Sequence, residues 1–124
     1  MSDELVVQGQ TIKMTFGRLN YVASKVGDLS EIASIFIVPE AQDRIVRAFL
    51  AKYKSEEGTK FYDSEDTIVE VDNLDPSDAI RILDFAEEHL NDFFLKALAK
   101  LDEKAKRREA QTNSSDNTPD GQKN

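Results

Sequence analysis

The sequence predicts a mainly α-helical chain with a small N-terminal β-hairpin, an α+β fold. Alternating apolar residues flank a glycine near the N-terminus, which is typical of a hairpin. Apolar residues then recur at helical spacing in several segments, the longest of which follows Asp75-Pro76. A chain of 124 residues with 40% hydrophobic residues suits one domain. We therefore expect a single helical domain with an N-terminal hairpin over residues 1–110, and a disordered polar tail over residues 111–124.

The hairpin is predicted over residues 4–16. Residues 5–7 form a β-prone run, residues 12–16 alternate between apolar and polar, and Gly9 lies between them as the turn residue. Gly17 should end the second strand, and residues 18–26 then have the spacing of a short helix.

Two more helices are predicted before the acidic middle of the chain. Asp28 can cap a short helix through Ile35, with Glu31 completing a capping box. Val38-Pro39 marks the start of the next, because proline suits the first helical turn, and its apolar spacing continues to about residue 53.

Residues 54–75 carry weaker signals. The polar segment 54–60 contains Gly58 and is predicted to be a loop. Residues 67–71 are β-branched and surrounded by acids, so they form either a lone edge strand or an extended connection.

Asp75-Pro76 is the clearest helix start, with a capping acid followed by a first-turn proline. The helix is expected to reach about Arg108, and it should either break near residues 89–92 or project beyond the domain. One stripe at steps of three or four is predicted to be buried, and it comprises Ala79, Leu83, Ala86, Leu90, Phe93, Ala97 and Leu101.

Composition and charge exclude several classes of protein. The chain has no cysteine, so it has neither disulfides nor thiolate chemistry. Its net charge is −8, and residues 54–92 alone hold 13 acids against 3 bases. Such an acidic middle is a poor match for a phosphate backbone. The basic cluster at residues 104–108 is best interpreted as complementing a helix C-terminus. With neither a signal peptide nor a membrane-length apolar run, we expect a soluble, cytoplasmic protein.

The sequence offers no catalytic or metal-binding constellation. The single histidine, His89, lies beside Glu88 and near Asp92, but no nucleophile or oxyanion site accompanies it. The acidic run at residues 63–75 lacks the glycine and the ligand alternation of a calcium loop. The five glycines are too dispersed to cradle a phosphate. We therefore expect a protein that is not an enzyme and that uses no cofactor or metal.

Its function would then depend on a surface. Three large apolar residues follow one another at positions 93–95, and consecutive helical residues are about 100° apart, so they cannot all face one core. Either the hairpin and the first helices cover this helix on two sides, or an apolar surface receives a partner. The candidate partner-binding residues are Phe93, Phe94 and Leu98, followed by Phe85 and Leu95.

The order of these elements resembles the tail assembly chaperones of long-tailed (siphovirus-type) bacteriophages. In that family a short hairpin leads through a Phe-Gly step into a helix, as residues 6–19 do here with the sequence VVQGQTIKMTFGRL. The family's helical layout is also similar to Val38-Pro39 with the IVRAFL of residues 45–50, and to Leu74-Asp75-Pro76 with the FFLKAL of residues 93–98. The resemblance covers roughly residues 5–101, by order of elements.

The resemblance implies a non-enzymatic role in viral tail assembly. Such chaperones keep the tape-measure protein soluble in the host cytoplasm until tail-tube protein polymerises around it, and they are absent from the mature virion. The implied partners are the tape-measure protein, the tail-tube protein, other copies of the chain and a longer product of programmed frameshifting. The ending Gln122-Lys123-Asn124 is compatible with a slippery run of adenines. Neither a membrane nor a nucleic acid is an expected partner.

Two alternatives remain open. The acidic middle of the chain also fits a small regulator or inhibitor that mimics nucleic acid and binds a basic protein. Such a mimic should bind in a strongly salt-dependent way, whereas an apolar contact should survive moderate salt. The third hypothesis is a structural subunit of the tail itself.

Overall fold

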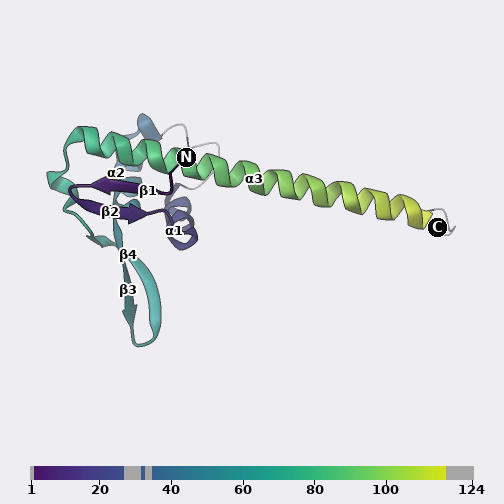
Figure 1. The fold of residues 1–124 in the computed structure, drawn as a ribbon, viewed down its shortest axis with the longest axis horizontal. Helices are drawn as coiled ribbons and strands as arrows, with labels where there is room; N and C mark the ends of the chain where they lie inside the picture. Colours follow the sequence, from purple (N-terminus) through teal and green to yellow (C-terminus); the bar gives the residue numbers. More distant parts are fainter. Residues whose placement is uncertain (1, 27–31, 33–34, 117–124) are drawn as a thin grey trace. The chain divides into compact units, whose positions relative to one another are not determined.

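The chain is mostly helical, with two small β-hairpins and a long C-terminal helix (Figure 1). The computed structural model describes residues 2–26, 32 and 35–116, with side chains through residue 108. The predicted fold class is thereby confirmed. The chain divides into two compact units, Met1–Leu90 and Asn91–Asn124, and each unit is described by itself.

The predicted N-terminal hairpin is confirmed, but its second strand is shorter than expected. Strand β1 (Glu4–Val7) pairs with β2 (Gln10–Lys13) in antiparallel register. Gln8 and Gly9 form the turn with φ values of 50° and 78°. Positive φ at both central residues is the geometry that suits the right-handed twist of a two-residue hairpin.

Helix α1 (Phe16–Val26) begins earlier than predicted, at Phe16, which was expected to belong to the second strand. The backbone N–H of Arg18 donates to Thr15 Oγ1 at 3.2 Å, so Thr15 caps the helix and terminates the extended segment. Phe16 consequently lies on the first turn, where it is 68% exposed. The helix predicted to begin at Asp28 lies largely outside the described residues, which include only Ile32 and Ile35 of its apolar positions.

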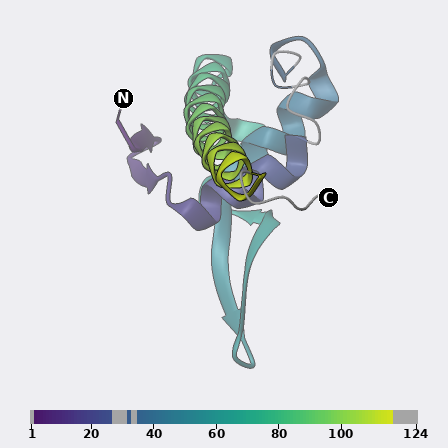
Figure 2. The ribbon, with the colours of Figure 1, turned by 90° about the vertical axis from the view of Figure 1, so that its right-hand side faces the viewer.

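Helix α2 (Pro39–Phe49) starts where Val38-Pro39 predicted. The prediction that it continues to residue 53 is wrong, because strand β3 (Ala51–Glu56) follows after Leu50 alone. The predicted loop at residues 54–60 is also wrong. Strand β3 pairs with β4 (Thr59–Thr67) around a two-residue turn, and this hairpin extends from the helices α1 and α2 (Figure 2).

The hairpin geometry explains why the helix stops. Tyr53 pairs with Tyr62 across the strands, and their ring centroids lie 4.7 Å apart. Glu57 and Gly58 both have positive φ, 51° and 82°, as a tight hairpin turn requires. Strand β4 ends at Thr67 and a 3-10 helix, η2 (Val71–Asn73), follows, so residues 67–71 do not form a separate edge strand.

Arg18 holds the corner between α2 and β3. Its side chain is buried and donates from Nη1 to the carbonyl oxygens of Phe49 at 2.6 Å and Ala51 at 2.7 Å. The guanidinium also lies 5.0 Å from the centroid of the Tyr62 ring, which links the corner to the hairpin. Desolvation lowers the pKa of Arg18, which remains charged at neutral pH. Gly17 leaves room for Tyr62, since a Cβ on Gly17 would lie 3.0 Å from the tyrosine hydroxyl oxygen.

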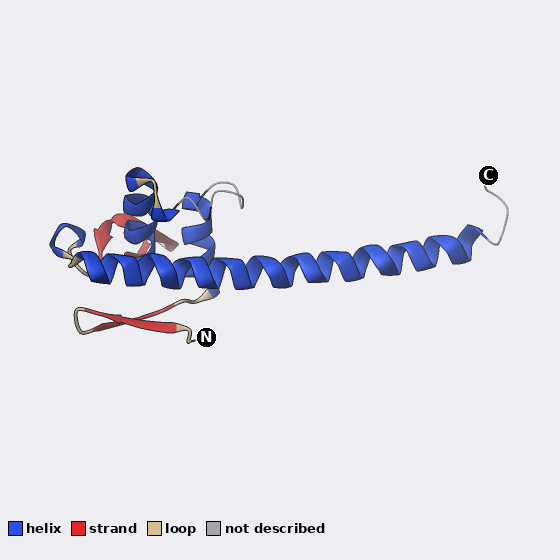
Figure 3. Ribbon diagram, turned by 90° about the horizontal axis from the view of Figure 1, so that it is seen from above, coloured by secondary structure: helices blue, strands red, loops and turns tan. Residues whose placement is uncertain are grey.

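Helix α3 (Pro76–Asp116) begins where Asp75-Pro76 predicted. It is helical throughout, so the first of the two alternatives, a break near residues 89–92, is wrong. Figure 3 shows its first part between the β1–β2 hairpin and the helices α1 and α2. The tail predicted over residues 111–124 begins inside this helix, and residues 117–124 lie outside the described part of the chain.

The apolar stripe of α3 is buried only as far as Leu90. The side chains of Ile82, Leu83, Ala86 and Leu90 are at most 1% exposed and pack in the core of the first unit. The prediction of one buried stripe through Leu101 is wrong beyond Leu90, because Leu101 is 61% exposed. In the described part of the chain beyond residue 90, Leu95, Leu98 and Leu101 are all more than half exposed.

Candidate interaction surfaces

The second unit presents an apolar face on helix α3. At about 100° per residue, Phe94, Leu98 and Leu101 fall within one narrow sector of the helix. Their spacing of four and then three residues is that of a coiled-coil seam. Leu98 is 53% exposed, and Phe94 is half-buried with its ring centroid 5.9 Å from that of Phe93. We call Phe94, Leu98 and Leu101 the α3 apolar face.

Most of the charged residues of this segment lie away from the α3 apolar face, and several of them pair with one another. Four ion pairs connect residues three or four positions apart, and they are Asp92–Lys96, Lys100–Glu103, Asp102–Lys106 and Glu103–Arg107. Exposed pairs of this kind stabilise a helix by about 0.3–0.5 kcal/mol each. The segment is therefore amphipathic. Its ion pairs stabilise the helix, and Leu98 and Leu101 on its apolar face are exposed.

The five predicted partner-binding residues do not share one surface. Phe94 and Leu98 belong to the α3 apolar face, whereas Phe93 lies about 100° around the helix from Phe94. Leu95 is 67% exposed, but its helical position places it among the charged residues. Phe85 is only 8% exposed and packs edge-on against Phe49, with ring centroids 5.5 Å apart. The structure therefore places Phe85 in the core.

Leu101 belongs to the apolar face although the sequence assigned it to the core. Its step of three residues from Leu98 was visible in the sequence. Apolar spacing does not show where along a helix the core ends. Buried and exposed apolar positions on α3 therefore have the same spacing in the sequence.

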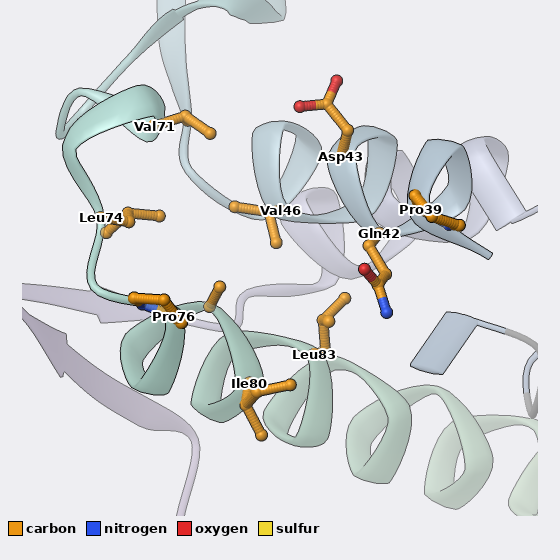
Figure 4. A pocket seen from close by; sticks show the side chains of 10 residues that line it. Pro39, Gln42, Asp43, Val46, Val71, Leu74, Pro76, Ile80 and Leu83 are labelled. Carbon is orange, nitrogen blue, oxygen red and sulfur yellow. The ribbon is translucent and has the colours of Figure 1, made fainter. Parts of the chain in front are cut away.

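A second apolar surface is a groove in the first unit between α2, η2 and the start of α3. Its volume is about 350 Å³. Val46 on α2 and Leu83 on α3 point into it from opposite sides (Figure 4). We call it the α2–α3 groove, and its lining residues are Pro39, Gln42, Asp43, Val46, Val71, Leu74, Pro76, Ala79, Ile80 and Leu83.

The rim of the α2–α3 groove is held together by charges. Arg47 donates from Nε to Asp43 at 3.0 Å and from Nη2 to Asp72 at 3.1 Å, which ties α2 to η2. These carboxylates, Asp43 first, raise the pKa of Arg47. Sequence analysis missed this groove, because Val71 and Leu74 lie in an acidic segment that is distant in sequence from the residues of α2.

The β3–β4 hairpin carries a cluster of alternating charges. Lys54 Nζ lies 2.8 Å from Asp63 Oδ2 and 2.9 Å from Asp66 Oδ2, and Lys52 Nζ lies 3.1 Å from Asp66 Oδ1. The hydrogen bond from Lys54 lowers the pKa of both Asp63 and Asp66, and the same contacts raise the pKa of Lys54. Part of the acidic middle of the chain is therefore neutralised within the hairpin.

These shifts predict how the Lys54 cluster responds to pH. Because the folded-state pKa values of Asp63 and Asp66 are depressed, their contribution to stability is present above about pH 4, the ordinary carboxyl range, and is lost on acidification below it. Because the pKa of Lys54 is raised, its contribution is fully present below about pH 10 and is lost at higher pH.

Lys54→Met should therefore be less stable than the wild type at pH 7, and the difference in stability should narrow as the pH falls below about 4. Urea unfolding of both proteins across this range measures the difference. Lys60→Met, on the same hairpin, is the control and should show no such pH-dependent gap. A stability gap for Lys54→Met that does not narrow at all on acidification would contradict the assignment.

No group of three or more metal-ligating side chains is present among the residues that the structure describes. His89 is half-buried, and its Nδ1 lies 2.9 Å from the carbonyl oxygen of Phe85, while its ring is 4.2 Å from the Phe85 ring. This environment gives His89 a packing role on α3.

No protein-family model matches the chain, and neither the curated proteins nor the solved structures contain a match. Among the described helices, none has the length and apolar character that a membrane span requires. Proposals about function therefore rest on the sequence and on the two surfaces described above.

Proposed function

We propose that this chain is a bacteriophage tail assembly chaperone that binds the helical tape-measure protein and keeps it soluble while tail-tube protein assembles. The observation that carries the proposal is the α3 apolar face, on which Leu98 and Leu101 are 53% and 61% exposed. Side chains of this size cost free energy when they face water, so their outward placement suits a contact with another chain.

The geometry of the face matches a helical client. Residues at steps of four and three form a seam that packs against the apolar stripe of a second helix. A tape-measure protein is a long helical chain whose apolar stripes remain uncovered until the tail tube surrounds it. Covering such a stripe removes the surface through which the client would otherwise aggregate.

The proposed role needs no chemistry beyond binding. The protein would act in the host cytoplasm without a cofactor and would be released before the virion is complete. Copies of the chain, and a longer frameshift product, would bind along one client. Binding energy that is modest per copy then accumulates over the length of the client.

A nucleic-acid mimic is the competing hypothesis, and the structure makes its acidic surface less suitable. Asp63 and Asp66, from the middle of the chain, each form an ion pair with Lys54. A mimic presents carboxylates to a basic partner, whereas these two already have cationic partners within the hairpin. Binding that collapses between low and moderate salt would favour the mimic.

Mutation of the α3 apolar face tests the proposal. Phe94→Ala and Leu98→Ala should each weaken client binding by about 2 kcal/mol, roughly thirtyfold, because each removes a large apolar group from the contact. Co-expression with the most helical protein encoded beside this gene measures the effect, as the fraction of that client that stays soluble and co-purifies. Circular dichroism should show an unchanged fold.

Leu95→Ala is the matched control, since it removes an equally large side chain from the charged side of the same helix. It should leave client solubility nearly unchanged. Equal losses from Leu95→Ala and Leu98→Ala would show that the apolar face has no special role. A well-expressed client that gains no solubility from the wild-type protein would overturn the proposed function.

A further inference from the structure

Two exposed cations on helix α3, Lys104 and Arg108, form no ion pair or hydrogen bond with any residue that the structure describes. Residues 91–108 hold six bases and three acids, a balance of +3. Each of the three acids contacts a base of the same helix, and the other four bases supply these contacts. The positive charge that is left over in this segment therefore belongs to Lys104 and Arg108.

These two cations continue the spacing of the α3 apolar face. Lys104 follows Leu101 at a step of three residues, and Arg108 follows Lys104 at a step of four. At about 100° per residue, Arg108 lies within about 20° of Leu101, and Lys104 lies about 60° from Leu101 on the same side. By the same geometry, each of the four paired bases lies about 100° or more from Leu101. A helix that covers Leu101 would therefore meet the two unpaired cations.

The C-terminus of α3 does not account for Lys104 and Arg108. The sequence analysis interpreted residues 104–108 as complementing a helix C-terminus, but α3 continues to Asp116, about two turns beyond Arg108. The helix dipole acts on charges within the last turn. The two cations lie outside that turn and have no partner within the helix, so a contact with another chain is the better explanation of their position.

We propose that Lys104 and Arg108 bind carboxylates of the client helix while Leu98 and Leu101 contact its apolar stripe. The inference rests on the proposed function and adds the chemistry of the client, an amphipathic helix with acidic residues at one end of its apolar stripe. Such a helix matches both the apolar spacing and the unpaired positive charge of the face. A nucleic acid is less suitable, because its phosphates would leave the leucines of the same face uncovered.

The two cations would also set the orientation of the client. At the other end of the α3 apolar face, near Phe94, the nearest base is Lys96, and its Nζ lies 2.9 Å from Asp92 Oδ2. Carboxylates of the client are therefore attracted to one end of the face. A client helix with basic residues at that end would be repelled by Lys104 and Arg108, which gives the contact specificity as well as affinity.

Synthetic peptides test the inference on the full-length protein. Three helical peptides share one leucine stripe with steps of four and three, and they differ at two positions beside one end of the stripe, which hold Glu, Gln or Lys. Each is made with the variable pair at its N-terminal end and again at its C-terminal end, so that both helix directions are sampled. Fluorescence anisotropy at low salt should show the Glu peptide binding about tenfold more tightly than the Lys peptide, with the Gln peptide between them.

Two double variants remove the same charge from different sides of α3. Lys104→Gln with Arg108→Gln should abolish the preference for the Glu peptide. Lys106→Gln with Arg107→Gln is the matched control and should retain most of that preference, because these bases lie away from the α3 apolar face. Leu98→Ala should weaken the binding of all three peptides about equally, since it removes an apolar contact that they share. Circular dichroism should show an unchanged helix content in each variant.

Several results would overturn the inference. They are the absence of binding by any peptide, equal binding of the three peptides by the wild type, and an equal loss of preference in both double variants, which would indicate an effect of net charge alone. Tighter binding of a duplex DNA than of the Glu peptide would assign the two cations to a nucleic acid instead.

The co-expression experiment separates this inference from the proposed function. If the client stays soluble with the wild type but the three peptides bind equally, the carboxylate contact is refuted and the chaperone role stands. If the Glu peptide is preferred but no client gains solubility, the proposed function is refuted and the carboxylate contact stands.

Discussion

Replacing Arg18 with methionine is expected to lower the free energy of unfolding by about 3–5 kcal/mol. The buried guanidinium donates to the carbonyl oxygens of Phe49 and Ala51 at 2.6 and 2.7 Å. Methionine fills part of the space but donates nothing, so two carbonyl groups would lose a charged donor at a site closed to water. The contact of the cation with the Tyr62 ring would be lost as well.

Urea unfolding followed by circular dichroism measures the loss. Arg18→Lys should fall between the wild type and Arg18→Met, because an ammonium can still donate but lacks the planar group that contacts Tyr62. Arg44→Met is the matched control, as its side chain is exposed and, among the residues that the structure describes, makes a 3.4 Å hydrogen bond to the carbonyl oxygen of Lys25. Its stability should stay within about 0.5 kcal/mol of the wild type. An Arg18→Met protein as stable as the Arg44→Met protein would refute the stabilising role of Arg18 at the corner between α2 and β3.

Phe85→Ala is expected to cost about 3–5 kcal/mol of stability. Phe85 packs edge-on against Phe49, whose side chain is fully buried, and its removal would leave a cavity between α2 and α3. Thermal and urea unfolding measure the effect. Leu98→Ala is the comparison, and it should change stability little because Leu98 is 53% exposed. A stable Phe85→Ala protein that no longer binds the client would instead make Phe85 a partner-binding residue.

The parts of the fold that the sequence predicted correctly are those set by local chemistry. Gly9 permits the positive φ of the first hairpin turn, and prolines at positions 39 and 76 mark the first turns of α2 and α3. Each of these signals depends on a few neighbouring residues. They could be recognised without knowing what packs against them.

The second hairpin could not be recognised in this way. Tyr53 has the spacing to continue α2, yet it lies in strand β3, where it pairs with Tyr62 nine residues later and the two rings meet at an angle of 45°. Arg18 satisfies the carbonyl groups at the same corner from 31 and 33 residues away. Contacts between distant residues outweighed local helical spacing here, and such contacts leave no periodic trace in a sequence.

The candidate surface was predictable in part. The run of apolar residues at positions 93–95 indicated an outward face on α3, and the structure places Phe94 and Leu98 there. It could not indicate that burial ends after Leu90, since the apolar period continues unchanged past that residue. The α2–α3 groove is formed by residues of α2, η2 and α3 together, so it could not be predicted from the sequence of any one of these segments.

The two hairpins also bear on how the chain reaches its native state. In the described residues, both strand pairings join neighbours in sequence, β1 with β2 and β3 with β4, and each closes over a two-residue turn. Closing short loops costs little chain entropy, and proteins dominated by local contacts fold in microseconds to milliseconds. If the chain has the role proposed above, folding on this timescale would let it bind a long client while the ribosome is still synthesising that client.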